Sequence, residues 1–241
     1  MSSRAVAVLA LGGFASAAAQ RASDPLLPLL AEYFGTTAGG ASAVITSFAV
    51  AYGALQLING PLGDRVGKYR MVFWVTAISA AGNLACALAP TLPLLVLARF
   101  FSGATVGAIV PLAMAWIGDV VPYERRQPVL ARFLIGSMLG GAMATTLSGA
   151  LGERYGWQAI FYVLAALYVL AAVLLRLELK SNPATQQRAI VREPMLQAFG
   201  RMFALLRNSW VRTLLITVAV EGAFSAGGLS FAAFHAHQTL G

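Results

Sequence analysis

The sequence contains few charged residues. Only 11% of its 241 residues are Asp, Glu, Lys or Arg, whereas a typical soluble domain has about 25%. Hydrophobic residues make up 59% of the chain, and the mean hydropathy is +0.74. So few charges could not cover the surface of a soluble domain. The composition therefore excludes a soluble globular protein and indicates that the chain is surrounded by lipid.

Cysteine is nearly absent, and so are the common catalytic motifs. The single Cys86 excludes a disulfide framework and a cysteine metal site, and we interpret it as a small buried side chain. The sequence has no G-x-S-x-G, no H-E-x-x-H and no phosphate-binding glycine loop. We therefore expect no enzymatic activity, no cofactor and no metal.

Long hydrophobic runs dominate what is present. A helix needs about 20 apolar residues to cross a bilayer, and these runs lack the alternation of strands. The fold class predicted is an all-α membrane protein, a helical bundle. Seven runs qualify: 5–31, 41–62, 71–89, 94–117, 128–151, 157–175 and 213–234.

The basic residues lie in alternate connections between these runs. All but three of the 17 Lys and Arg residues follow this rule, the exceptions being Arg21, Arg99 and Arg154. This is the positive-inside pattern, and it predicts a cytoplasmic N-terminus. The net charge of +8 therefore faces anionic lipid headgroups rather than nucleic acid.

A charged, glycine-rich segment of eleven residues joins the second and third runs. We expect a tight turn at 60–70 between antiparallel helices, with glycines allowing positive φ and close helix approach. Its pattern G-x-L-x-D-R-x-G-K-x-R resembles the signature loop of the major facilitator superfamily of secondary transporters. The resemblance implies a multi-pass protein of the plasma membrane (the bacterial inner membrane) and a gating role for Gly60, Gly63, Asp64, Arg65, Gly67, Lys68 and Arg70.

The first run contains two opposite charges, Arg21 and Asp24, three residues apart. We expect the helix to continue through them, so that they share one face and neutralise each other, while Pro25 and Pro28 distort its outer half. The segment 24–29 also resembles the first helix of drug:proton antiporters. The pair is therefore either part of a substrate or proton pathway or purely structural.

Two other helices carry polar groups for which two roles are open. In the second run, Tyr52, Gln56 and Asn59 form one stripe, for ligand contact or interhelical bonding. In the fourth, Arg99 either supports proton coupling, as the resemblance implies, or snorkels outward.

Regularly spaced glycines predict close helix packing. Gly103 and Gly107 follow Arg99 at intervals of four residues. Gly140 and Gly149 fall on the antiporter motif of helix five, but its Gly-Pro pair is replaced here by Ala144-Thr145. The lost proline weakens the specific resemblance to antiporters.

The predicted domains are a six-helix repeat over 1–176, a cytoplasmic linker over 177–211 and the first helix of a second repeat over 212–241. In the linker, five apolar residues at helical spacing predict an amphipathic surface helix: Leu196, Phe199, Phe203, Leu206 and Trp210. Glu221 in the last helix is either functional or a structural partner.

The resemblance implies proton-coupled export of a drug or metabolite by alternating access. Family members have two six-helix repeats, so we expect that a C-terminal half or a second subunit is missing from this chain. The alternative is a truncated, non-transporting half that only assembles with another polypeptide. The expected partners are lipid, a small-molecule substrate and protons.

Overall fold

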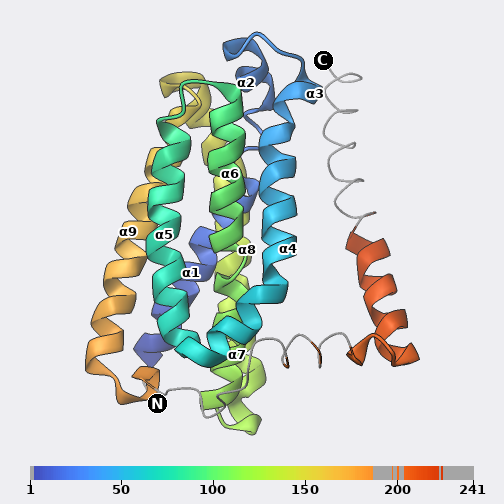
Figure 1. The fold of residues 1–241 in the computed structure, drawn as a ribbon. Helices are drawn as coiled ribbons and strands as arrows, with labels where there is room; N and C mark the ends of the chain where they lie inside the picture. Colours follow the sequence, from blue (N-terminus) through green and yellow to red (C-terminus); the bar gives the residue numbers. More distant parts are fainter. Residues whose placement is uncertain (1–2, 187–196, 198–199, 201–203, 223, 225–241) are drawn as a thin grey trace. The chain divides into compact units, whose positions relative to one another are not determined.

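The computed structural model describes residues 3–186, 197, 200, 204–222 and 224. It divides into two units, residues 1–192 and 193–241. Every regular element in the described ranges is helical, which confirms the all-α membrane fold. Figure 1 shows the first unit as a bundle of long, roughly parallel helices.

The first unit contains five candidate transmembrane segments. Five segments among the described residues are long and apolar enough to span a bilayer: Ala38–Val66, Lys68–Ala87, Leu92–Val120, Tyr123–Tyr155 and Gln158–Ser181. They correspond to α3 (Ala38–Ala41) with α4 (Ala43–Val66), to α5 (Lys68–Ala87), to α6 (Leu92–Val106) with α7 (Ile109–Val120), to α8 (Tyr123–Tyr155) and to α9 (Gln158–Ser181). A further long helix, α1 (Ser3–Arg21), precedes them in the chain.

α1 is surrounded by other helices, because it packs against α6, α7, α8 and α9. Its buried face carries mainly small side chains, among them Ala15, Ala18 and Ala19. Lipid provides no hydrophobic driving force between helices, so they associate by close packing. Small side chains allow this because they let neighbouring backbones approach closely. The alanine content of α1 therefore suits it to a central position.

The first run does not form one continuous helix, contrary to the sequence prediction. α1 ends at Arg21, a turn follows, and α2 (Leu27–Tyr33) begins afterwards with a proline in its first turn. Pro25 disfavours helical backbone at Asp24, and Pro28 suits a helix start but not a helix interior. The prolines thus interrupt the helix instead of distorting it.

The 60–70 segment is also different from the prediction of an eleven-residue turn. α4 continues to Val66, Gly67 alone forms the turn, and α5 starts at Lys68. Gly67 has φ +97°, a conformation that side-chain-bearing residues rarely adopt. Most of the motif is therefore helical, and its charges project from the last turn of α4 and the first turn of α5.

We call the end of the bundle at which α1 starts and α9 stops the basic end. In Figure 1 it lies at the bottom, with the junction of α4 and α5 and with α7, and the opposite end carries α2 and α3. α9 continues to Ser181, past residue 176, and η1 (Pro183–Gln186) follows it.

In the second unit, residues 209–222 are helical. This stretch includes Trp210 and Glu221, and Leu206 lies in a turn before it. Leu196, Phe199 and Phe203 of the predicted amphipathic helix lie outside the described residues, as does most of 223–241.

Candidate functional site

Arg99 is at the centre of the candidate site. Its side chain is completely buried, so it does not snorkel outward. Nη1 donates to the Ala19 carbonyl at 3.1 Å and Nε to the Val44 carbonyl at 3.4 Å. These bonds link α6 to α1 and α4, and they partly replace the hydration that a guanidinium loses inside a membrane.

Aromatic rings supply the rest of the Arg99 surroundings. The guanidinium carbon lies 3.9 Å from the ring centroid of Phe48 and 5.9 Å from that of Phe161. A cation over a ring face in a desolvated site contributes about 2 kcal/mol or more. Phe48 belongs to α4 and Phe161 to α9, so Arg99 joins four of the long helices.

One terminal amino group of Arg99, Nη2, has no hydrogen-bond acceptor within the described residues. This group is buried. Asp24, Cys86 and Tyr168 lie within electrostatic range of the guanidinium. Asp24 is the one carboxylate of these three.

Arg21 and Asp24 are brought together at the end of α1. Arg21 Nη1 lies 3.4 Å from Asp24 Oδ2. The two side chains are 45% and 35% exposed, because the helix has ended and the pair projects from a turn. Asp24 therefore lies between two cations, one exposed and one buried.

The three residues of the predicted polar stripe in α4 do not share one environment. Tyr52 is half-buried, interacts with the Ser16 hydroxyl of α1, and its ring lies 5.9 Å from that of Phe48. Asn59 is buried, and its Nδ2 has no partner among the residues described. Gln56, between them, is exposed. Tyr52 and Asn59 thus pack into the first unit, whereas Gln56 faces outward.

The charges of the 60–70 motif converge on Lys68. Its Nζ lies 3.4 Å from Asp64 Oδ1 and 2.5 Å from Asp119 Oδ2 of α7. Arg65 and Arg70 are exposed. The sequence predicted no partner for Asp119, although it begins the segment 119–126, which resembles the charged loop that follows the fourth helix in the superfamily.

Three of the predicted packing glycines touch a neighbouring backbone. A Cβ on Gly103 would overlap the Phe48 carbonyl, one on Gly107 would come within 2.8 Å of the Tyr52 carbonyl, and one on Gly140 would overlap the Phe14 carbonyl. Gly149 makes only an ordinary contact with Pro25 at 3.8 Å. Gly63 of the motif packs on Leu112, whereas Gly60 has open space around it.

Comparison with known families decides the identity. Residues 9–241 match the Major Facilitator Superfamily. The chain belongs to this superfamily. This result confirms the resemblance seen in the 60–70 motif.

Curated superfamily relatives are distant and longer. The lincomycin resistance protein of Streptomyces lincolnensis is 28% identical over 72% of this chain and 38% of its own length. The multidrug export protein EmrB of Escherichia coli K12 is 26% identical over 70% of this chain and 33% of its own. The chain spans between about a third and a half of the curated relatives that it matches.

One solved transporter structure has the same fold as this chain. A peptide transporter, POT, in complex with sulfate superimposes with a TM-score of 0.70 at 20% identity. The match covers 93% of this chain and 47% of the transporter. The similarity is one of fold alone.

Sequence reasoning also missed a contact at the basic end of this superfamily fold. Glu178 of α9 is buried, its Oε2 lies 3.5 Å from Arg4 Nε, and its Oε1 accepts a bond from Asn182 at 2.8 Å. Glu178 lies among Arg176 and Lys180, which made it look like part of an exposed charged linker.

Glu221 lies in the second unit, where its side chain is exposed on the helix over 209–222.

Proposed function

We propose that this chain forms the N-terminal half of a proton-coupled exporter that moves a drug or metabolite by alternating access. The observation that carries the proposal is the charge set of Arg99, Asp24 and Arg21. Ionisable groups within the membrane are rare, and by default they mark substrate or ion pathways. The named activities of the two relatives, lincomycin resistance and multidrug export, favour export of small molecules.

The charge set suggests a division of roles. Asp24 is the proton acceptor, since it lies in range of both cations and is partly exposed. When Asp24 is protonated it releases its cationic neighbours, and when it is ionised it attracts them. A proton therefore changes the forces between α1 and α6, which is the differential interaction that a two-state transporter requires.

The 60–70 motif has a gating role in this proposal. Lys68 joins the start of α5 to the end of α7, and Asp64 remains 61% exposed beside it. An exposed carboxylate at this end can form and break a contact with a second half as the transporter opens and closes.

The outer face of α4 is a candidate docking surface for that second half. Gly53 and Gly60 have open space where a Cβ would lie, and Gln56 is exposed between them. A polar side chain facing lipid is unfavourable, and bare glycines permit close approach of another helix. The same face would serve the alternative, a non-transporting half that only assembles with another polypeptide.

Reconstitution into liposomes tests the proposal. The chain is incorporated alone and together with any C-terminal half found in frame downstream or in an adjacent gene. Lincomycin and ethidium serve as probes, and internal pyranine reports protons. We expect probe movement driven by a proton gradient when both halves are present. A complex that assembles but moves neither probe nor protons contradicts the transporter and favours the alternative.

The proposed orientation places the basic end in the cytoplasm of a bacterial inner membrane. Cysteines introduced singly at Thr37, near α3, and Gln127, in α8, are both exposed, while the native Cys86 is buried. An impermeant maleimide should label T37C but not Q127C in intact cells. The reverse pattern would invert the orientation.

A further inference from the structure

One face of α5 carries a row of buried polar side chains that the proposed function does not use. Tyr69, Thr76, Ser79 and Asn83 are each no more than 1% exposed, and their spacings of seven, three and four residues place them on one side of the helix. From Tyr69 to Asn83 the row extends about 21 Å. We call these residues, with Ser102 and Thr105 of α6, the α5 seam.

Hydrogen bonds connect the middle of the α5 seam. Ser79 Oγ lies 2.8 Å from Thr105 Oγ1, and Asn83 Nδ2 donates to the Ser79 carbonyl at 2.8 Å and to Ser102 Oγ at 3.5 Å. The Ser79–Thr105 and Asn83–Ser102 contacts cross from α5 to α6. Several polar atoms of the seam still have no hydrogen-bond partner within the described residues.

Three atoms of the seam have no protein partner. They are Tyr69 Oη, Thr76 Oγ1 and Asn83 Oδ1, all buried and unbonded within the described ranges 3–186 and 204–222. Buried polar groups without a partner are strongly unfavourable, particularly in a membrane. Internal water commonly bridges such groups, with about one buried water per 27 residues in globular proteins.

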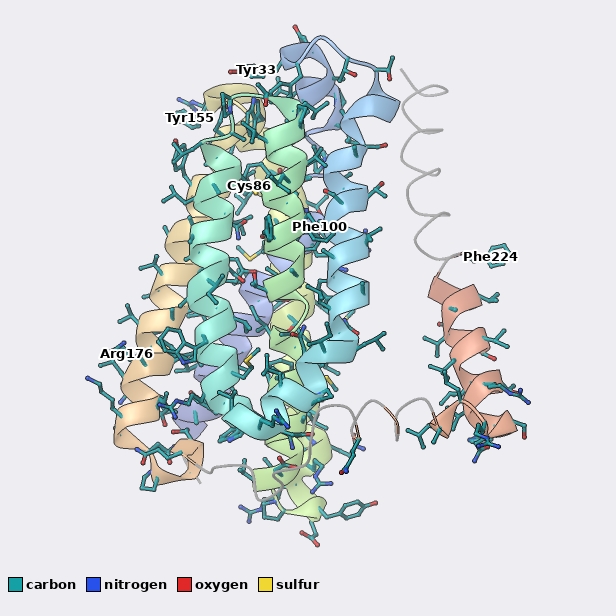
Figure 2. The ribbon with its side chains drawn as sticks, in the orientation of Figure 1. Tyr33, Cys86, Phe100, Tyr155, Arg176 and Phe224 are labelled. Atoms are coloured by element: carbon teal, nitrogen blue, oxygen red, sulfur yellow. The ribbon has the colours of Figure 1, made fainter. Side chains whose placement is uncertain are left out.

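Among the described residues, the two buried charged side chains are Glu178 and Arg99. At the basic end, Tyr69 lies within electrostatic range of Glu178. One turn beyond Asn83, Cys86 lies within range of Arg99. Figure 2 shows Cys86 inside the bundle, nearer the end that carries α2. α5 packs against both α9, which carries Glu178, and α6, which carries Arg99 with an unbonded Nη2 of its own.

We propose that the α5 seam binds a file of water molecules that connects Glu178 to Arg99. The waters hydrogen-bond to Tyr69, Thr76 and Asn83, each of which has an unused group. The role of this water file rests on the proton-coupled transporter proposed above. In that transporter, the water file is the path by which protons pass between the basic end and the charge set around Arg99. Each transfer passes a proton from one water to the next, so no other reactant is consumed.

Radiolytic footprinting of the full chain in detergent tests the water file directly. An X-ray pulse turns bound water into hydroxyl radicals, which oxidise side chains in contact with that water even when they are buried. Tyr69 and Tyr168 form a matched pair, because both are buried and only the Tyr168 hydroxyl is bonded, to the Ala15 carbonyl at 3.0 Å. We expect oxidation of Tyr69 but not of Tyr168. Equal protection of both would overturn the proposal.

The proton path is tested separately with Thr76→Val, which keeps the shape of the side chain and removes its hydroxyl. We expect less oxidation of Tyr69 and about tenfold slower proton uptake into liposomes, the effect of one lost hydrogen bond in the relay. The matched control is Thr145→Val, because the Thr145 hydroxyl is exposed and bonds only the Gly141 carbonyl of its own helix. Asn83→Leu provides a second variant if Thr76→Val does not fold.

The outcomes separate this inference from the proposed function. Labelled Tyr69 with unchanged proton uptake in both seam variants overturns the path. Absence of proton uptake in the unaltered, assembled protein counts against the proposed function, while labelling of Tyr69 would still support the water file.

Discussion

Lys68 Nζ lies 2.5 Å from Asp119 Oδ2, so the first residue of α5 is bound to the penultimate residue of α7. The side chains are 23% and 51% exposed. Water therefore screens the pair, and its contribution to stability is modest. Its geometric effect is larger, because it holds the ends of two transmembrane passages together beside the single-residue turn at Gly67.

Asp119→Asn should lower the free energy of unfolding by about 0.2–1 kcal/mol, because Lys68 keeps its contact with Asp64. Lys68→Met removes both ion pairs and should have a larger effect. Thermal unfolding in detergent measures both. The control is Arg70→Gln, since Arg70 is exposed at the same end; an equal response of Arg70→Gln and Lys68→Met would contradict a specific Lys68 contact.

Asp64→Asn should affect transport much more than stability. Asp64 is 61% exposed and 3.4 Å from Lys68, so its loss removes little from the folded half. If it holds a gate against the second half, the lost charge-assisted bond shifts the open and closed states by about 1.5–3 kcal/mol. Proton-driven flux of the assembled protein and its melting temperature are measured together. Unchanged flux would exclude the gating role.

The Arg99–Phe48 contact should appear as a coupling energy. In a double-mutant cycle with Arg99→Met and Phe48→Leu, we expect a coupling of about 0.5–2 kcal/mol, because the guanidinium carbon lies 3.9 Å from the ring centroid. Unfolding by denaturant gives the four free energies. If Phe48→Leu lowers the free energy of unfolding by the same amount whether residue 99 is Arg or Met, the two side chains do not interact.

Asp24→Asn should leave the protein folded, with a loss below about 1 kcal/mol. The sequence alone suggested a pair buried within a helix, but the structure leaves both side chains partly exposed at a helix end. Proton-driven flux should nevertheless be abolished if Asp24 is the proton acceptor. Glu32→Gln is the matched control, since Glu32 is an exposed carboxylate on the neighbouring α2. Equal flux in the two variants would remove Asp24 from the pathway.

Gly103→Ala should destabilise the bundle by about 1–3 kcal/mol, because the new Cβ would overlap the Phe48 carbonyl and force α6 away from α4. Gly118→Ala in α7 is the control. Open space surrounds that position, and alanine favours a helix interior by up to about 1 kcal/mol over glycine. The melting temperatures should move in opposite directions; a shared direction would show that helix propensity dominates over packing.

The passages of the first unit and the membrane environment could be predicted from sequence because both depend on the local density of apolar residues. The superfamily could be predicted because the 60–70 motif is short and contiguous. The helix break near Asp24 was also encoded locally, in Pro25 and Pro28, but its consequence was underestimated. The motif turn was placed too broadly, since a helix can contain charged residues once it reaches the membrane surface, and only Gly67 required a non-helical backbone.

The chain's own sequence determined where helices form and which of them carry charge, because backbone hydrogen bonding in lipid is satisfied within each segment. Only the tertiary structure decided which charges meet. Lys68 and Asp119 are 51 residues apart, and Arg99 bonds a carbonyl 80 residues away. The burial of Arg99, the unbonded groups of the α5 seam and the Arg4–Glu178 contact all depend on which helix faces pack together. That choice is made by small residues such as Gly103 and Gly140, at which two backbones touch, and helical periodicity alone does not name the partner helix.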